Sequence, residues 1–296
     1  MQDSMQAARR REEGWAYLML APYLLMFVLF LVYPSLHGLY LSFTDAQLGG
    51  REIAWIGIEN YTWVLTDPLF ARVVVNTLIF VAESTPLLIV IPLALAVALN
   101  RGLPFQGLLR GAFFVPFTLS VSVIGITWWW LLEPGFGLLN AVLRDLGASP
   151  PAWLTSPGWA MFGVVVATVW WTAGYNLVLF LAGLQAIPAS LYEAARIDGA
   201  NAWREFRYIT LPLLRPTMLL VVVIQVIASF QVFGQVFVMT QGGPGDGTRT
   251  VIQYVYEAAF VNRRMAEGSA AAWILFIIIV IFSWIQFRVL RGHTEY

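Results

Sequence analysis

The stretch Ser190–Pro216, SLYEAARIDGANAWREFRYITLPLLRP, is the most polar long segment of an otherwise apolar chain. Ser190 and Glu193 stand at the Ser-x-x-Glu spacing of a capping box, which predicts that a short helix begins there. Gly199 favours the end of that helix, and Asn201 favours the beginning of a second one. The stretch is therefore predicted to form a compact helix–turn–helix, whose small residues leave a flat face that another protein can approach.

Composition places the rest of the chain in a membrane. The 296 residues are 59% hydrophobic and 11% charged, with a mean hydropathy of +0.73, whereas a soluble domain carries about 25% charged residues. The formal net charge of zero gives no basic footprint for nucleic acid. The chain has no cysteine, and His37 and His293 lie far apart. The sequence therefore predicts no disulfide, no thiol chemistry and no metal site.

Six apolar runs are long enough to cross a membrane, which takes about 20 helical residues. The predicted spans are residues 14–44, 73–99, 111–132, 159–186, 217–240 and 269–287, and the regions 45–72, 133–157 and 241–268 are predicted loops. The predicted fold class is all-α, a polytopic membrane protein with six transmembrane helices.

Arginine carries all the positive side-chain charge, because the chain has no lysine. Six spans place both termini on one side. If that side is the cytoplasm, the inner segments hold eleven arginines and the outer loops hold six. Cytoplasmic segments carry the excess of basic residues in membrane proteins. We therefore expect both termini and the loop 188–216 to be cytoplasmic.

The loop resembles the EAA motif of permease subunits of ATP-binding-cassette (ABC) importers. Read as E-A-A-x3-G-x9-I-x-L-P, the motif is matched at Glu193, Ala194, Ala195, Gly199, Ile209, Leu211 and Pro212, with Asp198 and Ala200 beside the glycine. The resemblance implies that these residues form the coupling helix, which sits in a groove of a cytoplasmic ATPase. The plainer interpretation is a solvated hairpin between two spans, in which Ser190 and Glu193 serve only as a cap.

Weaker landmarks of carbohydrate importer permeases extend the resemblance over most of the chain. They stand in family order at residues 40–44, 57, 60–61, 76–78, 116 and 137–140. The segment TQGGP at 240–244 is similar to the break after the fifth helix of the maltose/glycerol-phosphate-type first permease. The chain resembles the common six-helix form of that family.

The resemblance implies a type-1 ABC importer permease fold and one half of a sugar-uptake pathway in a prokaryotic inner membrane. The implied partners are a second homologous permease, an ABC ATPase dimer, an extracytoplasmic sugar-binding protein and the lipid bilayer. ATP and Mg²⁺ are expected on the ATPase and no cofactor on this chain, because a lysine-free sequence has no G-x4-G-K-[ST] loop. The expected organisation is a cytoplasmic segment 1–14, a first helix with an outer loop 15–71, a permease core 72–287 containing the coupling loop 188–216, and a cytoplasmic tail 288–296.

Glu83 is the one acid well inside an apolar segment. Because a charge within the membrane is costly, such a residue is a candidate for the translocation path. The plainer alternative is a protonated or hydrated carboxyl near Pro86, with Ser84 and Thr85 as local partners.

Polar residues recur at helical spacing in the fourth and fifth predicted spans. The two faces consist of Thr168, Thr172 and Asn176, and of Gln225, Ser229 and Phe233. A sugar needs amides, hydroxyls and aromatic rings together, and family members that bind solute in the membrane use these two helices. By position, the resemblance implies a pathway at Thr172, Ala173, Asn176, Ser229 and Phe233. Hydrogen bonding between helices is the plainer role.

Two other classes of protein are alternatives to the importer permease. An ion-coupled secondary transporter predicts paired intramembrane charges and repeated broken helices, but the sequence shows only Glu83 and no evident repeat. A membrane-embedded enzyme needs convergent catalytic groups, and the sequence has no G-x-S-x-G element. The chain is therefore expected to be a transport subunit and not an enzyme.

Overall fold

The structure is a computed structural model that describes residues 17–50, 53–100 and 105–291. Within these ranges the chain is helical apart from its loops and an isolated bridge between Thr44 and Trp55, which confirms the all-α prediction. The predicted segment 1–14 and most of the predicted tail lie outside the described residues. The chain divides into two compact units, Met1–Leu65 with Val255–Trp273, and Thr66–Tyr254 with Ile274–Tyr296.

The first unit contains the first predicted span, which is an apolar helical run at Tyr17–Leu41. Its last part is α2 (Tyr33–Leu41). The segment after α2 is held by Asn60 of α3 (Glu59–Thr66), whose Nδ2 donates to the carbonyls of Ser42 and Thr44 at 2.9 and 2.7 Å. The predicted loop 45–72 therefore contains a helix, and Asn60 ties this helix to the turn that follows α2.

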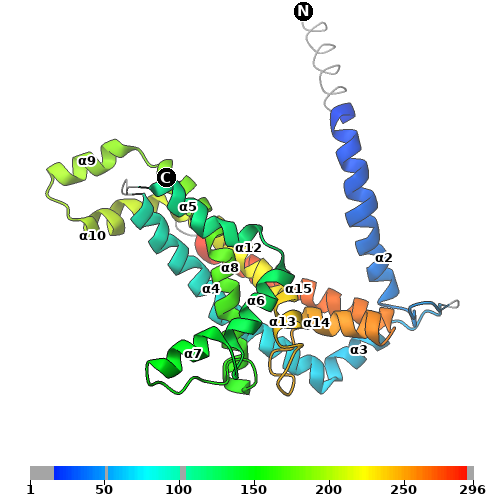
Figure 1. Cartoon of the computed structure of the whole chain (residues 1–296). Helices are drawn as coiled ribbons and strands as arrows, with labels where there is room; N and C mark the ends of the chain where they lie inside the picture. The colour runs from blue at the N-terminus through cyan, green and yellow to red at the C-terminus, as the bar shows by residue number, and fades with distance from the viewer. Residues whose placement is uncertain (1–16, 51–52, 101–104, 292–296) are drawn as a thin grey trace, which may run out of the picture. The chain divides into compact units, whose positions relative to one another are not determined.

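The second unit holds most of the chain. Its helices are α4 (Pro68–Leu99), α5 (Gln106–Phe114), α6 (Val121–Leu132), α7 (Leu138–Asp145), α8 (Pro157–Gln185), α9 (Ala189–Ile197), α10 (Ala202–Glu205), α11 (Leu211–Leu213), α12 (Arg215–Phe230) and α13 (Gly234–Met239). The later part of α15 (Met265–Arg291) also belongs to it, whereas α14 (Val251–Tyr256) lies where the chain passes between units. In Figure 1, α7 and the α9–α10 pair lie at opposite ends of α8.

Helices α4 and α8 form the centre of the second unit, and α12 packs beside α4. Small residues allow the close approach: a Cβ at Gly174 of α8 would collide with the carbonyl of Phe113 in α5. Close packing at glycine is the usual means of joining helices in a membrane, where lipid gives no hydrophobic drive for helix association.

The third predicted span is not one straight helix. The segments Gln106–Thr118 and Val121–Leu132 meet at 99°, so the prediction of an uninterrupted helix at 111–132 is wrong. Pro116 lacks a backbone N–H and favours a helix end nearby. Leu119 is extended, and the side chain of Ser120 caps the next helix by accepting from Val123 N at 3.4 Å.

The fifth predicted span, 217–240, is also interrupted, because α12 ends at Phe230 and α13 begins at Gly234. The carbonyl of Val232 between them accepts a hydrogen bond from Thr250 Oγ1 at 2.9 Å instead of continuing the helix. The helical segments 202–213 and 215–230 meet at a bend of 67°. The predicted loops 133–157 and 241–268 contain the helices α7 and α14, which the prediction also missed.

Within the described residues, four helices are long and apolar enough to cross a membrane, and the number is six if each of the two bent pairs forms one span. The fourth predicted span agrees closely with α8, and the second and sixth correspond to the longer helices α4 and α15.

Candidate functional site

The predicted helix–turn–helix is a hairpin of α9 and α10 at one end of the second unit (Figure 1). Gly199 follows α9 with a φ of +77°, and no atom lies within 4 Å of the position that its Cβ would take. Glycine is therefore favoured by the backbone conformation and not by crowding. Asn201 caps α10, because its Oδ1 accepts from Arg204 N at 2.9 Å. Both of these predictions are confirmed.

The predicted capping box at Ser190 and Glu193 is wrong. α9 begins at Ala189 with Pro188 in the cap position, and no side chain caps it. The proline disfavours helical geometry in the residue before it, so the new helix begins directly after Pro188. Ser190 then lies inside the first turn, and Glu193 is an exposed residue of the helix.

Side-chain contacts tie the hairpin together. Arg196 Nε of α9 donates to Glu205 Oε1 of α10 at 2.8 Å. This hydrogen bond to the Glu205 carboxylate raises the pKa of Arg196 above its ordinary value. Tyr192 and Thr210 share a hydrogen bond of 3.0 Å between their hydroxyl oxygens at the base of the hairpin.

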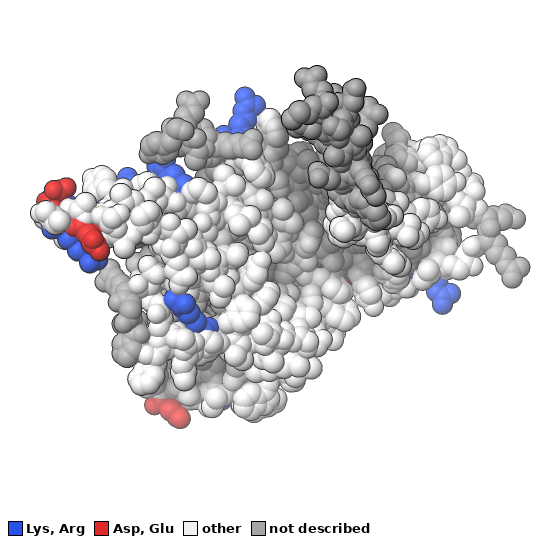
Figure 2. Space-filling view, turned by 90° about the horizontal axis from the view of Figure 1, so that it is seen from above, with Lys and Arg blue, Asp and Glu red and all other residues white. Residues whose placement is uncertain are grey.

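The residues predicted for coupling divide by exposure. Glu193, Ala194, Asp198 and Gly199 are exposed, whereas Ala195, Ala200, Ile209, Leu211 and Pro212 are half-buried. Ile209 packs against the apolar core at this end of α8. Figure 2 shows charged side chains crowded over the α9–α10 end of the molecule. The tip of the hairpin thus presents carboxylates and small residues, and its base anchors it to the membrane helices.

A cavity of about 540 Å³ lies between the hairpin and the adjoining ends of α4 and α8. Its lining combines Asn100, Tyr192 and Thr210 with the carboxylates of Glu193 and Glu205.

Asn176 lies in a buried polar cluster that joins α4, α8 and α12. Its Nδ2 donates to the carbonyl of Leu88 in α4 at 2.8 Å and to Gln225 Oε1 in α12 at 3.0 Å. Pro92, four residues after Leu88, has no N–H, so the Leu88 carbonyl has no partner within its own helix. Asn176 supplies the missing donor from a neighbouring helix.

Ser229 of α12 completes this cluster. Its Oγ lies 3.2 Å from Ser84 Oγ and accepts from Thr85 Oγ1 at 3.5 Å and from Gln225 Nε2 at 3.4 Å. All of these side chains are buried. Asn176 and Ser229 are therefore engaged between helices of this chain, in the arrangement that the plainer interpretation describes.

Thr172 and Ala173 lie about one turn before Asn176 on α8. Thr172 is half-buried and donates to the Thr168 carbonyl at 2.8 Å, and Ala173 is buried. Phe233 lies beyond the end of α12 with an irregular backbone. It does not share a helical face with Gln225 and Ser229, and that spacing argument is wrong because α12 ends at Phe230.

Glu83 is half-buried on α4, and its Oε2 has no hydrogen-bond partner among the described residues. Ser84 and Thr85 bond to Ser229 and not to Glu83. The expectation that they serve as local partners of the carboxyl is therefore wrong. Adjacent residues on a helix point in different directions, which explains why neighbours in sequence do not meet here.

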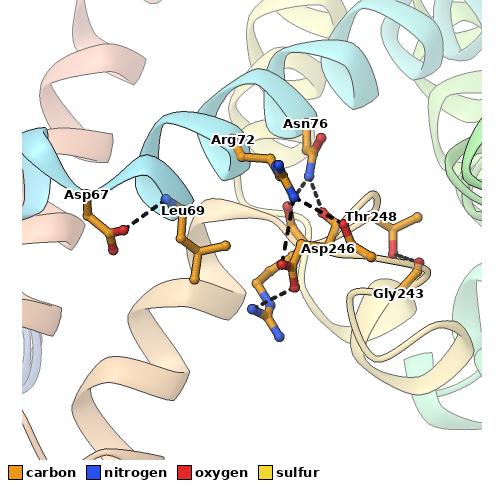
Figure 3. A network of polar contacts seen from close by, with 9 residues as sticks. Asp67, Leu69, Arg72, Asn76, Gly243, Asp246 and Thr248 are labelled. Atoms are coloured by element: carbon orange, nitrogen blue, oxygen red, sulfur yellow. Dashed lines mark hydrogen bonds and ion pairs between the residues drawn. The ribbon is translucent and has the colours of Figure 1, made fainter.

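Sequence reasoning missed a polar network at the start of α4. Asn76 Nδ2 donates to the carbonyls of Asp246 and Arg249 at 2.7 and 2.9 Å. Arg72 Nη1 donates to the Gly245 carbonyl at 3.3 Å. Figure 3 shows Arg72 and Asn76 reaching from α4 to the turn that carries Asp246.

Two further contacts fix the same turn. Asp246 Oδ1 pairs with Arg249 Nη1 at 2.9 Å, and Val251 N donates to Thr77 Oγ1 at 3.1 Å. In the sequence, residues 76–78 and 240–244 are separate landmarks with no visible link between them. The signal available in the sequence was an Asn–Thr pair at the start of a long apolar helix, where polar groups need a partner.

Comparison with known families finds one family model that matches most of the chain. Residues 70–292 match the family model described as "Binding-protein-dependent transport system inner membrane component". The matched range includes the hairpin, the buried polar cluster and the network at the start of α4.

Two curated relatives cover nearly the whole chain. The arabinooligosaccharides transport system permease protein of Bacillus subtilis (strain 168) is 36% identical over 275 residues, which is 92% of this chain and 87% of the relative. The sn-glycerol-3-phosphate transport system permease protein of Brucella abortus biovar 1 (strain 9-941) is 36% identical over 283 residues, 95% of this chain and 96% of the relative.

A solved structure has a similar fold. A chain in the crystal structure of a bacterial ABC transporter involved in the import of the acidic polysaccharide alginate superposes with a TM-score of 0.86. The match is 23% identical and covers 98% of this chain and 100% of that one.

Proposed function

Because the chain belongs to the family of binding-protein-dependent transport system inner membrane components, we propose that it forms one half of the translocation pathway of an ATP-driven uptake system for sugars or related hydroxyl-rich solutes. The chain is a transport subunit of a multi-pass membrane system and not an enzyme. Nothing in its relatives or its fold supports ion-coupled secondary transport. The relatives named for arabinooligosaccharides and glycerol phosphate support a solute with several hydroxyls.

The observation that carries the proposal is the α9–α10 hairpin. It projects carboxylates and small residues from one end of the membrane helices, while Tyr192 and Ile209 anchor its base. We infer that this surface receives a separate ABC ATPase, which binds ATP and Mg²⁺. The partners are then an ATPase dimer, a second homologous permease and an extracytoplasmic binding protein that delivers the solute.

In this arrangement the hairpin transmits ATPase closure to α8 and α12, which flank it in the chain. A ligand shifts a conformational equilibrium only through its different affinity for the two states. ATP would therefore favour the outward-facing state by drawing together the hairpins of the two permeases. The Arg196–Glu205 bond is compatible with this role, because it links the two short helices of the hairpin.

The pathway residues remain part of the proposal. Thr172, Phe233 and Glu83 are half-buried, so they are the side chains that we place along the path. Ala173 lies next to Thr172 on α8. Asn176 and Ser229 are assigned to the wall of the path, where their bonds hold α4, α8 and α12 together.

Substitutions at Gly199 test the coupling assignment. Any side chain there incurs strain of about 1 kcal/mol from the left-handed backbone, although asparagine tolerates this conformation better than other residues. We expect Gly199→Asn to retain the ATPase and transport, and Gly199→Trp to lose ATPase binding because its bulk covers the tip. Glu193→Lys should weaken binding of the ATPase, because it reverses an exposed charge on the hairpin.

The measurements are co-purification of the ATPase with the permease pair, and solute-stimulated ATP hydrolysis beside uptake in proteoliposomes. Normal binding and uptake in both Gly199→Trp and Glu193→Lys would show that the hairpin is an ordinary loop.

The proposed orientation has both termini and the hairpin in the cytoplasm, supported by the arginine distribution. Single cysteines can report on it because the natural chain has none. In right-side-out vesicles, an impermeant thiol reagent should label Ser149→Cys at once and Arg204→Cys only after permeabilisation. The reverse order of labelling would overturn the orientation.

A further inference from the structure

Helix α7 exposes an apolar face at the end of the second unit opposite to the hairpin (Figure 1). Leu138, Val142 and Leu146, at or just after α7, recur every four residues, which places them in one stripe. They are 52%, 48% and 76% exposed, respectively. A surface helix of a soluble protein turns such a stripe inward, so α7 has the opposite orientation.

Hydrogen bonds from the buried Asn140 and the exposed Arg144 hold α7 in place. Asn140 is fully buried; its Nδ2 donates to the Glu133 carbonyl at 2.9 Å, and its Oδ1 accepts from Trp153 Nε1 at 2.8 Å. Arg144 donates to the carbonyls of Pro134 and Gly135 at 3.1 and 3.2 Å. These bonds fix the rotation of α7 about its axis. The hydrogen bonds that orient α7 therefore also keep the apolar stripe exposed.

The position of α7 along the chain sets its level relative to the bilayer. It lies between α6 and α8, which belong to two of the candidate spans. Only residues 133–137 separate it from the end of α6, so α7 lies close to the membrane boundary.

Exposed aromatic rings surround the same level. Trp129 near the end of α6 contacts Phe136 with 6.5 Å between ring centroids, and Trp159 near the start of α8 contacts Trp153 at 5.2 Å. Trp129, Phe136 and Trp159 are all exposed. Tryptophan-rich rings gather where a membrane protein meets the headgroup region, and the apolar stripe of α7 continues this surface.

We propose that α7 is an interfacial helix, which lies in the headgroup region of the leaflet opposite to the hairpin and buries Leu138, Val142 and Leu146 among the lipids. Helices with one apolar face bind membranes in this way. The helix would hold the α6–α8 connection at a fixed depth while the spanning helices rearrange. This inference goes beyond the proposed transport function and requires only that α8 and the bent pair containing α6 cross a bilayer.

A spin label at position 142 tests the proposal in the complete transporter. Val142→Cys is labelled and the permease pair with its ATPases is placed in nanodiscs of phosphatidylethanolamine and phosphatidylglycerol. We expect collisions with lipid-soluble oxygen to exceed collisions with water-soluble nickel chelate by several-fold. The matched control is Ser149→Cys in the exposed loop after α7, where the nickel chelate should dominate.

Two results would overturn the proposal. A label at position 142 that is as accessible to nickel as the label at 149, with or without binding protein, would place the stripe in water. A label that is immobile and inaccessible to both reagents would place it against a second protein. Labels at positions 138 and 146 guard against a local effect of the label at 142. The proposal is overturned only if these two labels also fail to show more collisions with oxygen than with the nickel chelate.

Discussion

Asn176 compensates for a hydrogen bond that Pro92 removes from α4. The amide of residue 92 would normally donate to the carbonyl of Leu88, and proline has no such N–H. Asn176 Nδ2 of α8 occupies the vacancy at 2.8 Å and also bonds to Gln225 Oε1 at 3.0 Å. This arrangement predicts that the need for Asn176 depends on the presence of Pro92.

The substitution Asn176→Leu removes both hydrogen bonds and keeps a side chain of similar length. Hydrogen bonds between membrane helices contribute about 0.6 kcal/mol on average and up to about 1.7 kcal/mol, so two of them amount to about 1.2 to 3.4 kcal/mol. In a Pro92→Ala background the Leu88 carbonyl regains its helical partner. Only the Gln225 bond is then lost, and the cost of Asn176→Leu should fall to about half, roughly 0.6 to 1.7 kcal/mol.

The assay is a double-mutant cycle on the unfolding free energy of the purified chain in mixed micelles, titrated with a denaturing detergent and followed by circular dichroism. Pro86→Ala is the matched control, because it restores an N–H to the same helix at a position that faces the carbonyl of Ala82 and not that of Leu88. Asn176→Leu should therefore cost the same in the Pro86→Ala background as in the natural chain.

Equal costs of Asn176→Leu in the natural and Pro92→Ala backgrounds would refute the reasoning. Uptake measured on the same proteins separates this structural role from direct contact with the solute. If Asn176 acts by holding helices, Pro92→Ala should restore part of the uptake lost in Asn176→Leu. If it touches the solute, the loss should remain although stability is regained.

Three other outcomes are expected. Asn201→Ala should destabilise the start of α10 by about 0.5–2 kcal/mol through loss of its cap, which would appear as faster hydrogen exchange at residues 202–205. The control Ser190→Ala should leave hydrogen exchange in α9 unchanged, because Ser190 caps nothing. Equal effects of the two substitutions would contradict the assignment of caps. Asn76→Ala should release the turn at 245–250 and speed its hydrogen exchange, with a loss of about 1–3 kcal/mol for two hydrogen bonds, while the neighbouring Val75→Ala serves as a control and should not. Gly174→Leu should prevent close packing of α8 against α5 and abolish folding of the chain. Gly158→Ala, at the open start of α8, should be tolerated. Folding of Gly174→Leu at natural yield would show that the contact with Phe113 is dispensable.

The sequence by itself determined the class of the protein. Apolar runs such as 159–186 are long enough for a membrane and agree closely with α8. The spacing of Glu193, Gly199 and Pro212 pointed to the family, and the backbone preferences of Gly199 and Asn201 located the turn of the hairpin. These features are readable because hydropathy, backbone conformation and side-chain capping depend on residues close together in the chain.

Only the tertiary structure decided where the spans break and which polar groups meet. Pro92 shows in the sequence that a carbonyl lacks its donor, but the donor that fills the place, Asn176, lies 88 residues after Leu88. Asn76 likewise meets a turn 170 residues away. The carbonyl of Val232, just after the end of α12 at Phe230, is likewise taken by Thr250, 18 residues further along the chain. Local preferences cannot reveal such pairs, because a buried polar group is satisfied by whichever partner the packing of the helices brings within reach.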